Sequence, residues 1–198
     1  TITLNQKEVE NYVNSLAVKY NTLGKNRSFM TSYGRELTLT RGTYGWSLDV
    51  NQEIENLKTE LFSGKTVVRD AVFSKKAASL SGNDYGNSYI EVNLTAQHMF
   101  VYKNGSKVLE TDFVSGNVAK GYQTPVGIYG IRFKKSPSIL RGADYATPVS
   151  YWMPFFGSYG LHDASWRKSF GKTIYKTNGS HGCVNLPPAK ARELYSLA

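Results

Sequence analysis

The sequence predicts a mainly β domain with a sandwich or barrel-like arrangement of strands, preceded by a smaller α+β domain. Two amphipathic helix patterns lie in the first 64 residues, and short alternating strand patterns dominate after residue 88. Between them, residues 79–88 form a turn-rich and weakly hydrophobic stretch. We therefore predict two domains, residues 1–84 and residues 88–198.

Two helices are predicted in the first domain. Asn5 is a suitable N-cap with Glu8 as its capping-box partner, and apolar residues then recur at helical spacing, which predicts a helix over residues 6–23. Asp49 is a second N-cap and predicts a helix over residues 50–62. The rest of this domain reads as strands and turns.

The remaining elements are strands, apart from one C-terminal helix. In the first domain, residues 28–50 predict strands with turns, and residues 66–73 predict one strand. In the second domain, strand patterns occur in five segments: 89–94, 98–102, 107–115, 121–131 and 150–156. Proline at the first turn indicates a helix over residues 187–197.

The composition is that of a globular protein of 198 residues, with 40% hydrophobic and 20% charged side chains. No run of eighteen apolar residues is present, so no membrane-spanning segment is expected in this sequence. The formal net charge is +9, and residues 88–198 hold 13 of the 24 basic residues but 6 of the 15 acidic ones. A basic surface favours an anionic partner, but no nucleic-acid-binding motif is present and nucleic acid is not expected.

The only cysteine, Cys183, lies in a run that carries candidate chemistry, SHGCVNL over residues 180–186. A thiol is nucleophilic as thiolate, and imidazole is the side chain best suited to accept its proton. His181 lies two residues before the cysteine and His162 lies further upstream. Gly182 permits a sharp turn, so the amides of Gly182 and Cys183 could point at a developing oxyanion. These residues predict a cysteine nucleophile.

Two other roles for Cys183 remain open at this point. A lone cysteine is more often a small buried hydrophobe, although its polar neighbours here are not typical of a strand interior. A cysteine and histidine pair can also bind zinc. With one cysteine, three histidines and neither a CxxC nor an HExxH pattern, we expect no metal site and no cofactor.

The residues around both histidines resemble a known family signature. His162, a gap of seventeen residues and then SHGCVN over residues 180–185 resemble the signature of the L,D-transpeptidase (YkuD-type) catalytic domain. The run TPVGIY over residues 124–129 is similar to the TPxGxY element of that family. The resemblance covers roughly residue 88 to the end, and the first 85 residues resemble the peptidoglycan-binding modules found beside such domains.

The resemblance implies a peptidoglycan L,D-transpeptidase, an acyltransferase that forms 3→3 cross-links. Its implied partners are two peptidoglycan stem peptides. Cys183 would form a thioester with the donor tetrapeptide and release D-alanine, and an amine of the acceptor stem would then take the acyl group. Carbapenem β-lactams are implied inhibitors. The implied location is extracytoplasmic, in the cell wall or on the outer face of the bacterial membrane, with any anchor outside these 198 residues.

Roles can be predicted for single residues, and that of His162 is implied by the resemblance. His162 is predicted to be the base and to contact the substrate, in preference to His181, which would be a second acid/base or orienting group. Ser180 is predicted to fix the tautomer of the imidazole, through its side chain or its carbonyl. Because a histidine and two amides surround it, the Cys183 thiol is expected to have a lowered pKa.

Other functions are weighed against this reading. A sortase-like cysteine transpeptidase is the nearest enzymatic alternative, and Arg192 lies downstream of Cys183 as a sortase arginine would. However, Ser-His-Gly precedes the cysteine where sortases have Thr-Leu-x-Thr. A papain-like protease would place its cysteine before its histidine, which is the reverse of the order here. A non-catalytic cell-wall binding module with an inert thiol is the non-enzymatic alternative.

Overall fold

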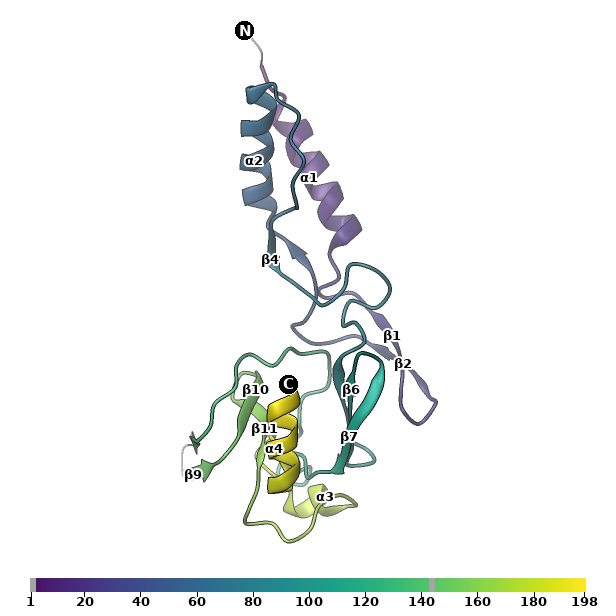
Figure 1. Ribbon diagram of the computed structural model, residues 1–198, viewed down its shortest axis with the longest axis vertical. Helices are drawn as coiled ribbons and strands as arrows, with labels where there is room; N and C mark the ends of the chain where they lie inside the picture. The colour runs from purple at the N-terminus through teal and green to yellow at the C-terminus, as the bar shows by residue number, and fades with distance from the viewer. Residues whose placement is uncertain (1–2, 143–144) are drawn as a thin grey trace. The chain divides into compact units, whose positions relative to one another are not determined.

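The computed structural model describes residues 3–142 and 145–198, which form two compact units (Figure 1). Unit 1 comprises the described residues up to Arg27 together with Thr43–Gly86, and unit 2 comprises Ser28–Gly42 and Asn87–Ala198. The sequence-based division assigned residues 28–42 to the first domain, whereas they group with unit 2. The reason lies in the contacts of that segment, which are described below.

Unit 1 contains the two predicted helices, which pack side by side (Figure 1). Helix α1 is Gln6–Tyr20, and the Asn5 side chain accepts a hydrogen bond from the Glu8 N–H. Helix α2 is Val50–Ser63, and the Asp49 side chain accepts from the Gln52 N–H. Both N-caps are therefore confirmed. The short strands β3 (Ser47–Leu48) and β4 (Phe73–Lys75) pair antiparallel below the helices.

The strand predicted over residues 66–73 is wrong except at its end, since only Phe73–Lys75 is a strand. Glu53 on α2 is buried, and it holds the segment between α2 and β4 to the helix. Its carboxylate pairs with Arg69 at 2.8 Å and accepts a hydrogen bond from the Val72 N–H. A backbone amide bound to a side chain is not available for a strand ladder, so the sequence alternation has no structural consequence there.

Near the end of unit 1, an exposed segment leads to a buried ion pair. Leu80 is 72% exposed and residues 81–83 are also exposed, whereas Asp84 is buried and pairs with Arg27 at 2.6 Å. The Arg27 guanidinium and the Thr22 hydroxyl lower the pKa of Asp84 against the effect of its burial. Asp84 therefore anchors the end of this segment.

Limited proteolysis is expected to cut the chain between Leu80 and Asn83. Exposed polar backbone with few apolar anchors is the preferred substrate of proteases. The exposed hairpin tip at residues 103–106 serves as an internal comparison. It should resist cleavage, because the ladder of β6 (His98–Lys103) and β7 (Ser106–Asp112) holds the backbone on both sides of it. Mass spectrometry of the fragments identifies the cut, and primary cleavage within residues 100–110 would contradict the expectation.

Residues 28–42 form a hairpin of β1 (Arg27–Met30) and β2 (Glu36–Leu39) that belongs to unit 2. The buried carboxylate of Glu91 accepts hydrogen bonds from the N–H and the hydroxyl of Ser32. The ring of Phe29 also meets that of Tyr89 edge to face. Such contacts join residues about 60 positions apart, so local sequence patterns do not reveal them.

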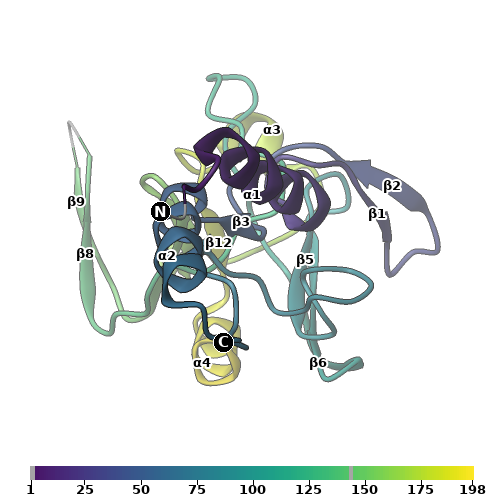
Figure 2. The ribbon, with the colours of Figure 1, turned by 90° about the horizontal axis from the view of Figure 1, so that it is seen from above.

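Unit 2 is built on two three-stranded sheets. One sheet is the antiparallel meander of β5 (Tyr89–Asn93), β6 (His98–Lys103) and β7 (Ser106–Asp112). The other contains β10 (Trp152–Phe156), β11 (Tyr159–Asp163) and β12 (Val184–Leu186). A separate hairpin of β8 (Ser138–Arg141) and β9 (Ala146–Val149) projects from the unit (Figure 2). The helices are α3 (Ile174–Asn178) and α4 (Pro188–Leu197), of which α4 was predicted.

The strand predicted over residues 121–131 does not form, although Ile128 makes one isolated bridge to Gly42. Pro125 has no N–H to donate, and Gly127 has a φ of 144°, which no regular strand uses. Strands β8, β9, β11 and β12, in contrast, were not predicted. The prediction of a mainly β unit preceded by a smaller α+β unit is confirmed.

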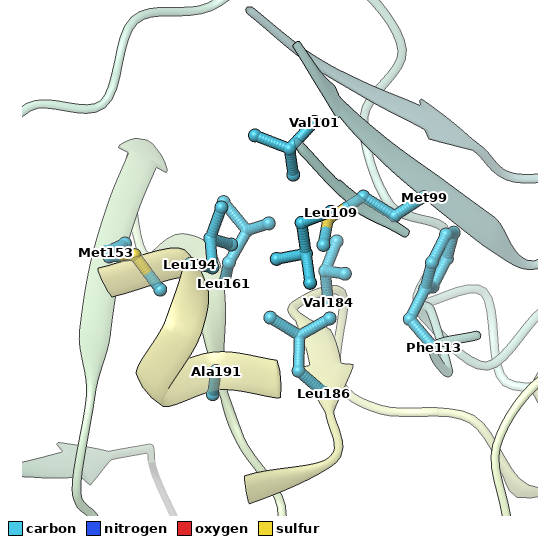
Figure 3. Packing of buried hydrophobic residues seen from close by; sticks show 10 residues of the cluster. All are labelled: Met99, Val101, Leu109, Phe113, Met153, Leu161, Val184, Leu186, Ala191 and Leu194. Carbon is cyan, nitrogen blue, oxygen red and sulfur yellow. The ribbon is translucent and has the colours of Figure 1, made fainter. Parts of the chain in front are cut away.

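The core of unit 2 lies between its two sheets and α4 (Figure 3). Ten buried side chains form it: Met99, Val101, Leu109, Phe113, Met153, Leu161, Val184, Leu186, Ala191 and Leu194. Leu161 of β11 and Val184 of β12 face this core. Because side chains alternate along a strand, Gly160 and His162 face away from it. None of the helices within residues 3–142 and 145–198 is long and apolar enough to cross a membrane.

Candidate active site

Strands β11 and β12 bring the cysteine and the upstream histidine together. They pair in parallel, with Leu161 opposite Val184 and His162 opposite Asn185. Cys183 directly precedes β12 and is two residues from Asn185, so it shares the non-core face of the sheet with His162. The backbone N–H of Gly160 lies close enough to the Cys183 sulfur to favour its thiolate form. The two sequence segments thus meet at one face of one sheet.

A tight turn before β12 positions Cys183. Gly182 has a φ of 119°, and a Cβ at this position would lie 2.2 Å from the Tyr159 ring. Only glycine fits both the backbone conformation and the space. The Ser180 hydroxyl closes the turn, because it donates to the Cys183 carbonyl at 2.5 Å and accepts from the Gly182 N–H at 3.0 Å.

This turn corrects two sequence-based predictions. Ser180 contacts the backbone of Gly182 and Cys183, not an imidazole, so it does not fix the histidine tautomer. The Gly182 N–H is bound to Ser180 Oγ, so it is not a free oxyanion donor as predicted. Both corrections have the same cause, because a serine hydroxyl readily forms hydrogen bonds with nearby backbone.

The TPVGIY run supports the turn from a distant part of the chain. Its buried Thr124 donates a hydrogen bond from its hydroxyl to the Gly182 carbonyl at 2.8 Å and accepts one from the Gly116 N–H at 3.0 Å. Gly116 has no room for a side chain, since a Cβ there would lie 1.7 Å from the Tyr122 carbonyl oxygen. The sequence indicated this run as a motif but not its role.

His162 is buried, at 4% exposure, and its tautomer is fixed. Its Nδ1 lies 2.8 Å from the carbonyl oxygen of Asp163, and because a carbonyl can only accept, Nδ1 carries the hydrogen. The Asp163 backbone therefore fills the role predicted for Ser180. Burial lowers the pKa of His162, and the ring of Trp152 lies 5.9 Å away, centroid to centroid. The imidazole is neutral at neutral pH, with Nε2 as its basic nitrogen.

The thiol of Cys183 is protonated in this state. Burial raises the pKa of Cys183 to about 11, although the Gly160 N–H acts in the opposite direction. The expectation of a lowered pKa is therefore wrong for the free protein, because desolvation outweighs the nearby donor. The thiol donates to the Ser158 carbonyl oxygen at 3.7 Å. Among the described residues it makes no hydrogen bond to His162, so proton transfer belongs to the reacting complex.

Alkylation of Cys183 should report this raised pKa directly, since it is the only thiol in the chain. The iodoacetamide rate is expected to rise roughly tenfold per pH unit from pH 7 to pH 9, and to level off near pH 11, because only the thiolate reacts. The denatured protein is the control, and its rate should level off near pH 9. A plateau below pH 8 in the folded protein would contradict a buried neutral thiol.

His181 lies on the exposed side of the site, between two aromatic rings. The Tyr145 ring stacks on it at 5.1 Å and the Tyr122 ring tilts against it at 4.9 Å, both measured between centroids. No hydrogen bond of the described residues joins His181 to Cys183. The structure thus brings His162 and Cys183 to one face and leaves His181 at its margin.

Comparison with known proteins decides the family. A model described as "L,D-transpeptidase catalytic domain" matches residues 87–198, and one described as "Putative peptidoglycan binding domain" matches residues 1–69. The chain belongs to the L,D-transpeptidase family. A search of curated protein sequences returned no match.

Solved structures of this family support the assignment. An L,D-transpeptidase of Enterococcus faecium, in the form of a cysteine-to-serine mutant, is 34% identical with a TM-score of 0.82, and the match covers 100% of this chain and 80% of that one. The carbamoyl enzyme of Ldtfm with avibactam is 35% identical with the same TM-score, and the match covers 100% and 79%. The E. faecium catalytic domain acylated by ertapenem is 41% identical with a TM-score of 0.50, and the match covers 57% and 91%.

Proposed function

We propose that this protein is a peptidoglycan L,D-transpeptidase that works through a thioester on Cys183. The observation that carries the proposal is the shared face of β11 and β12. It places the only cysteine of the chain beside the Gly160 N–H, on the same side as a buried neutral histidine with a fixed tautomer. A thiol, a base with one available nitrogen and a backbone donor are the groups that acyl transfer requires.

In the first half-reaction, Cys183 is acylated by the donor stem. His162 Nε2 takes the thiol proton while sulfur attacks the carbonyl of the third residue of a tetrapeptide. The C–N bond to the terminal D-alanine then breaks, and His162 gives the proton to the leaving amine. The products are a thioester and free D-alanine. The Gly160 N–H stabilises negative charge on the sulfur, and the Cys183 N–H is the donor predicted for the oxyanion.

In the second half-reaction, an amine of another stem attacks the thioester carbonyl. The C–S bond breaks, the new amide forms and the amine proton returns through His162 to sulfur, which regenerates the thiol. When the acceptor is the side-chain amine of a third residue, the product is a 3→3 cross-link. A neutral thiol in the free enzyme fits this cycle, because the sulfur is protonated before acylation and again after the thioester is resolved.

The substrate and the location follow from both parts of the chain. The family match of residues 1–69 supports peptidoglycan as the partner of the N-terminal unit. The basic excess in residues 88–198 favours an anionic polymer, as the cell wall is. We therefore place the protein outside the cytoplasm, at the cell wall.

β-Lactams are the proposed inhibitors. A similar structure, 41% identical to this chain, carries the β-lactam ertapenem as an acyl group. Another, 35% identical, carries a carbamoyl group from avibactam, which is not a β-lactam but is likewise a cyclic electrophile. A strained β-lactam carbonyl presents the same electrophile as the donor amide, so Cys183 would open the ring and remain acylated.

The deciding experiment is incubation of the full chain with a disaccharide tetrapeptide, followed by mass spectrometry of the products. A cross-linked dimer whose mass shows the loss of one D-alanine is the expected product. Its fragmentation should place the new bond between two third-position residues. Products that keep both D-alanines, or no dimer at all, would overturn the proposal.

A further inference from the structure

Arg167 carries a buried nitrogen that the fold leaves without a partner. Two buried side-chain polar atoms have none among the described residues, Arg167 Nε and Asn185 Oδ1. Asn185 pairs with His162 across the sheet, and Arg167 follows His162 by five residues. A buried polar group that is left unpaired destabilises the protein, and more so when it is charged. Both unpaired atoms therefore belong to segments of the candidate active site.

The guanidinium of Arg167 also has no acidic partner within ion-pair distance in the described part of the chain. The other partly buried arginines differ, since Arg27 pairs with Asp84 and Arg69 pairs with Glu53. Burial lowers the pKa of Arg167, as expected for a cation that no carboxylate compensates. A half-buried cation with no carboxylate beside it can take an anion from outside the protein.

A hydrogen bond from Arg167 joins the loop after β11 to the segment that leads to Ser180. Arg167 lies in the loop after β11, and its Nη1 donates to the Asn178 carbonyl at 2.9 Å, two residues before Ser180. Its charge is close enough to His162 to lower the pKa of that imidazole. The neighbouring Trp166 is half exposed and its ring lies 6.0 Å from the His162 ring, centroid to centroid.

We propose that Arg167 binds the C-terminal carboxylate of the acyl donor, on the amino acid that leaves. This proposal rests on the function proposed above. The leaving amine must lie at His162 to receive its proton, and one carbon joins that amine to the carboxylate. The carboxylate would therefore be recognised by a cation on the His162 side of the sulfur.

Binding of the carboxylate would also make His162 a stronger base. The positive charge of Arg167 opposes protonation of His162. A bound carboxylate neutralises that charge, so His162 accepts the thiol proton more readily once a proper donor is present. A donor whose terminus is a neutral amide would lack both the ion pair and this effect.

The test compares two donors, a tetrapeptide with a free C-terminal carboxylate and the same peptide as its C-terminal amide. Release of the terminal residue is measured as kcat/KM for the wild-type chain, Arg167→Gln and Arg167→Lys. We expect the wild type to prefer the acid by about 10–100-fold, the usual value of a charge-assisted hydrogen bond. Arg167→Gln should lose the preference, and Arg167→Lys should keep part of it. Lys168→Gln is the matched control, because it removes an adjacent exposed charge, and it should keep the preference.

The ratio between donors separates recognition from structure, because a merely structural role would slow both donors equally. Equal rates on both donors in the wild type would overturn the proposal, and this comparison needs no variant to fold. An unchanged preference in Arg167→Gln would also overturn it, while transpeptidation itself would stand. No release from either donor would overturn the proposed function together with this inference.

Discussion

Replacing Cys183 with alanine is expected to abolish transpeptidation, with a rate loss on the order of 10⁶, as for removal of other nucleophiles. The wild-type chain should gain one covalent adduct with a carbapenem, located in the peptide that contains Cys183, and the alanine variant should gain none. Cys183→Ser should also be nearly inactive, because His162 would have to deprotonate a hydroxyl of much higher pKa. Intact-protein mass spectrometry measures the adduct.

The Cys183 variants also test the alternative that the protein is a non-catalytic binding module with an inert thiol. An unmodified wild-type mass after carbapenem treatment, or an adduct that persists in Cys183→Ala, would contradict the thioester mechanism. Both variants should keep the fold, since the half-buried Cys183 side chain is not part of the core cluster. A circular dichroism spectrum identical to the wild type would show that the loss is chemical.

His162→Ala is expected to lower the acylation rate by ~10²–10⁴, the usual contribution of a positioned acid–base group. Among the described residues, the change removes the imidazole that β11 presents on the Cys183 face of the sheet. His181→Ala is the matched control, because it removes the other nearby imidazole, which lies exposed between Tyr122 and Tyr145. Its loss should be smaller, and stopped-flow acylation by a carbapenem compares the two.

A larger loss in His181→Ala than in His162→Ala would reverse the assignment of the base. Substrate binding gives a second check. His162→Ala should lower the acylation rate at saturating β-lactam, because the imidazole acts in the chemical step and not in binding. A change confined to the apparent dissociation constant would instead place His162 in recognition.

Local interactions explain what could be predicted of the fold. Asn5 and Asp49 mark helix starts because a capping side chain binds a backbone N–H three residues away. Hairpin β8–β9 was missed, although its strands pair locally. Strand β12 was also missed, since it has only three residues and pairs with the distant strand β11. The false strand at residues 66–73 shows the same limit, because a buried glutamate on another element determined that segment.

The candidate site, too, could be predicted from the sequence only in part. The residue types identified Cys183 and His162, because few side chains can supply a nucleophile and a base. Their supporting contacts come from backbone groups, such as the Asp163 carbonyl at His162 and the Gly160 N–H at Cys183. Backbone groups occur in every residue and leave no compositional signal. The raised pKa of Cys183 was missed for a related reason, since burial is a property of the whole fold.

The half-buried, neutral thiol of Cys183 has a consequence for its reaction with oxidants. Oxidants attack the thiolate, and a pKa of about 11 leaves roughly one molecule in ten thousand as thiolate at pH 7. A single cysteine in the chain also offers no second thiol for an internal disulfide. A neutral thiol in the folded protein is therefore expected to react slowly with peroxide, whereas the unfolded chain would expose an ordinary thiol that is more easily oxidised.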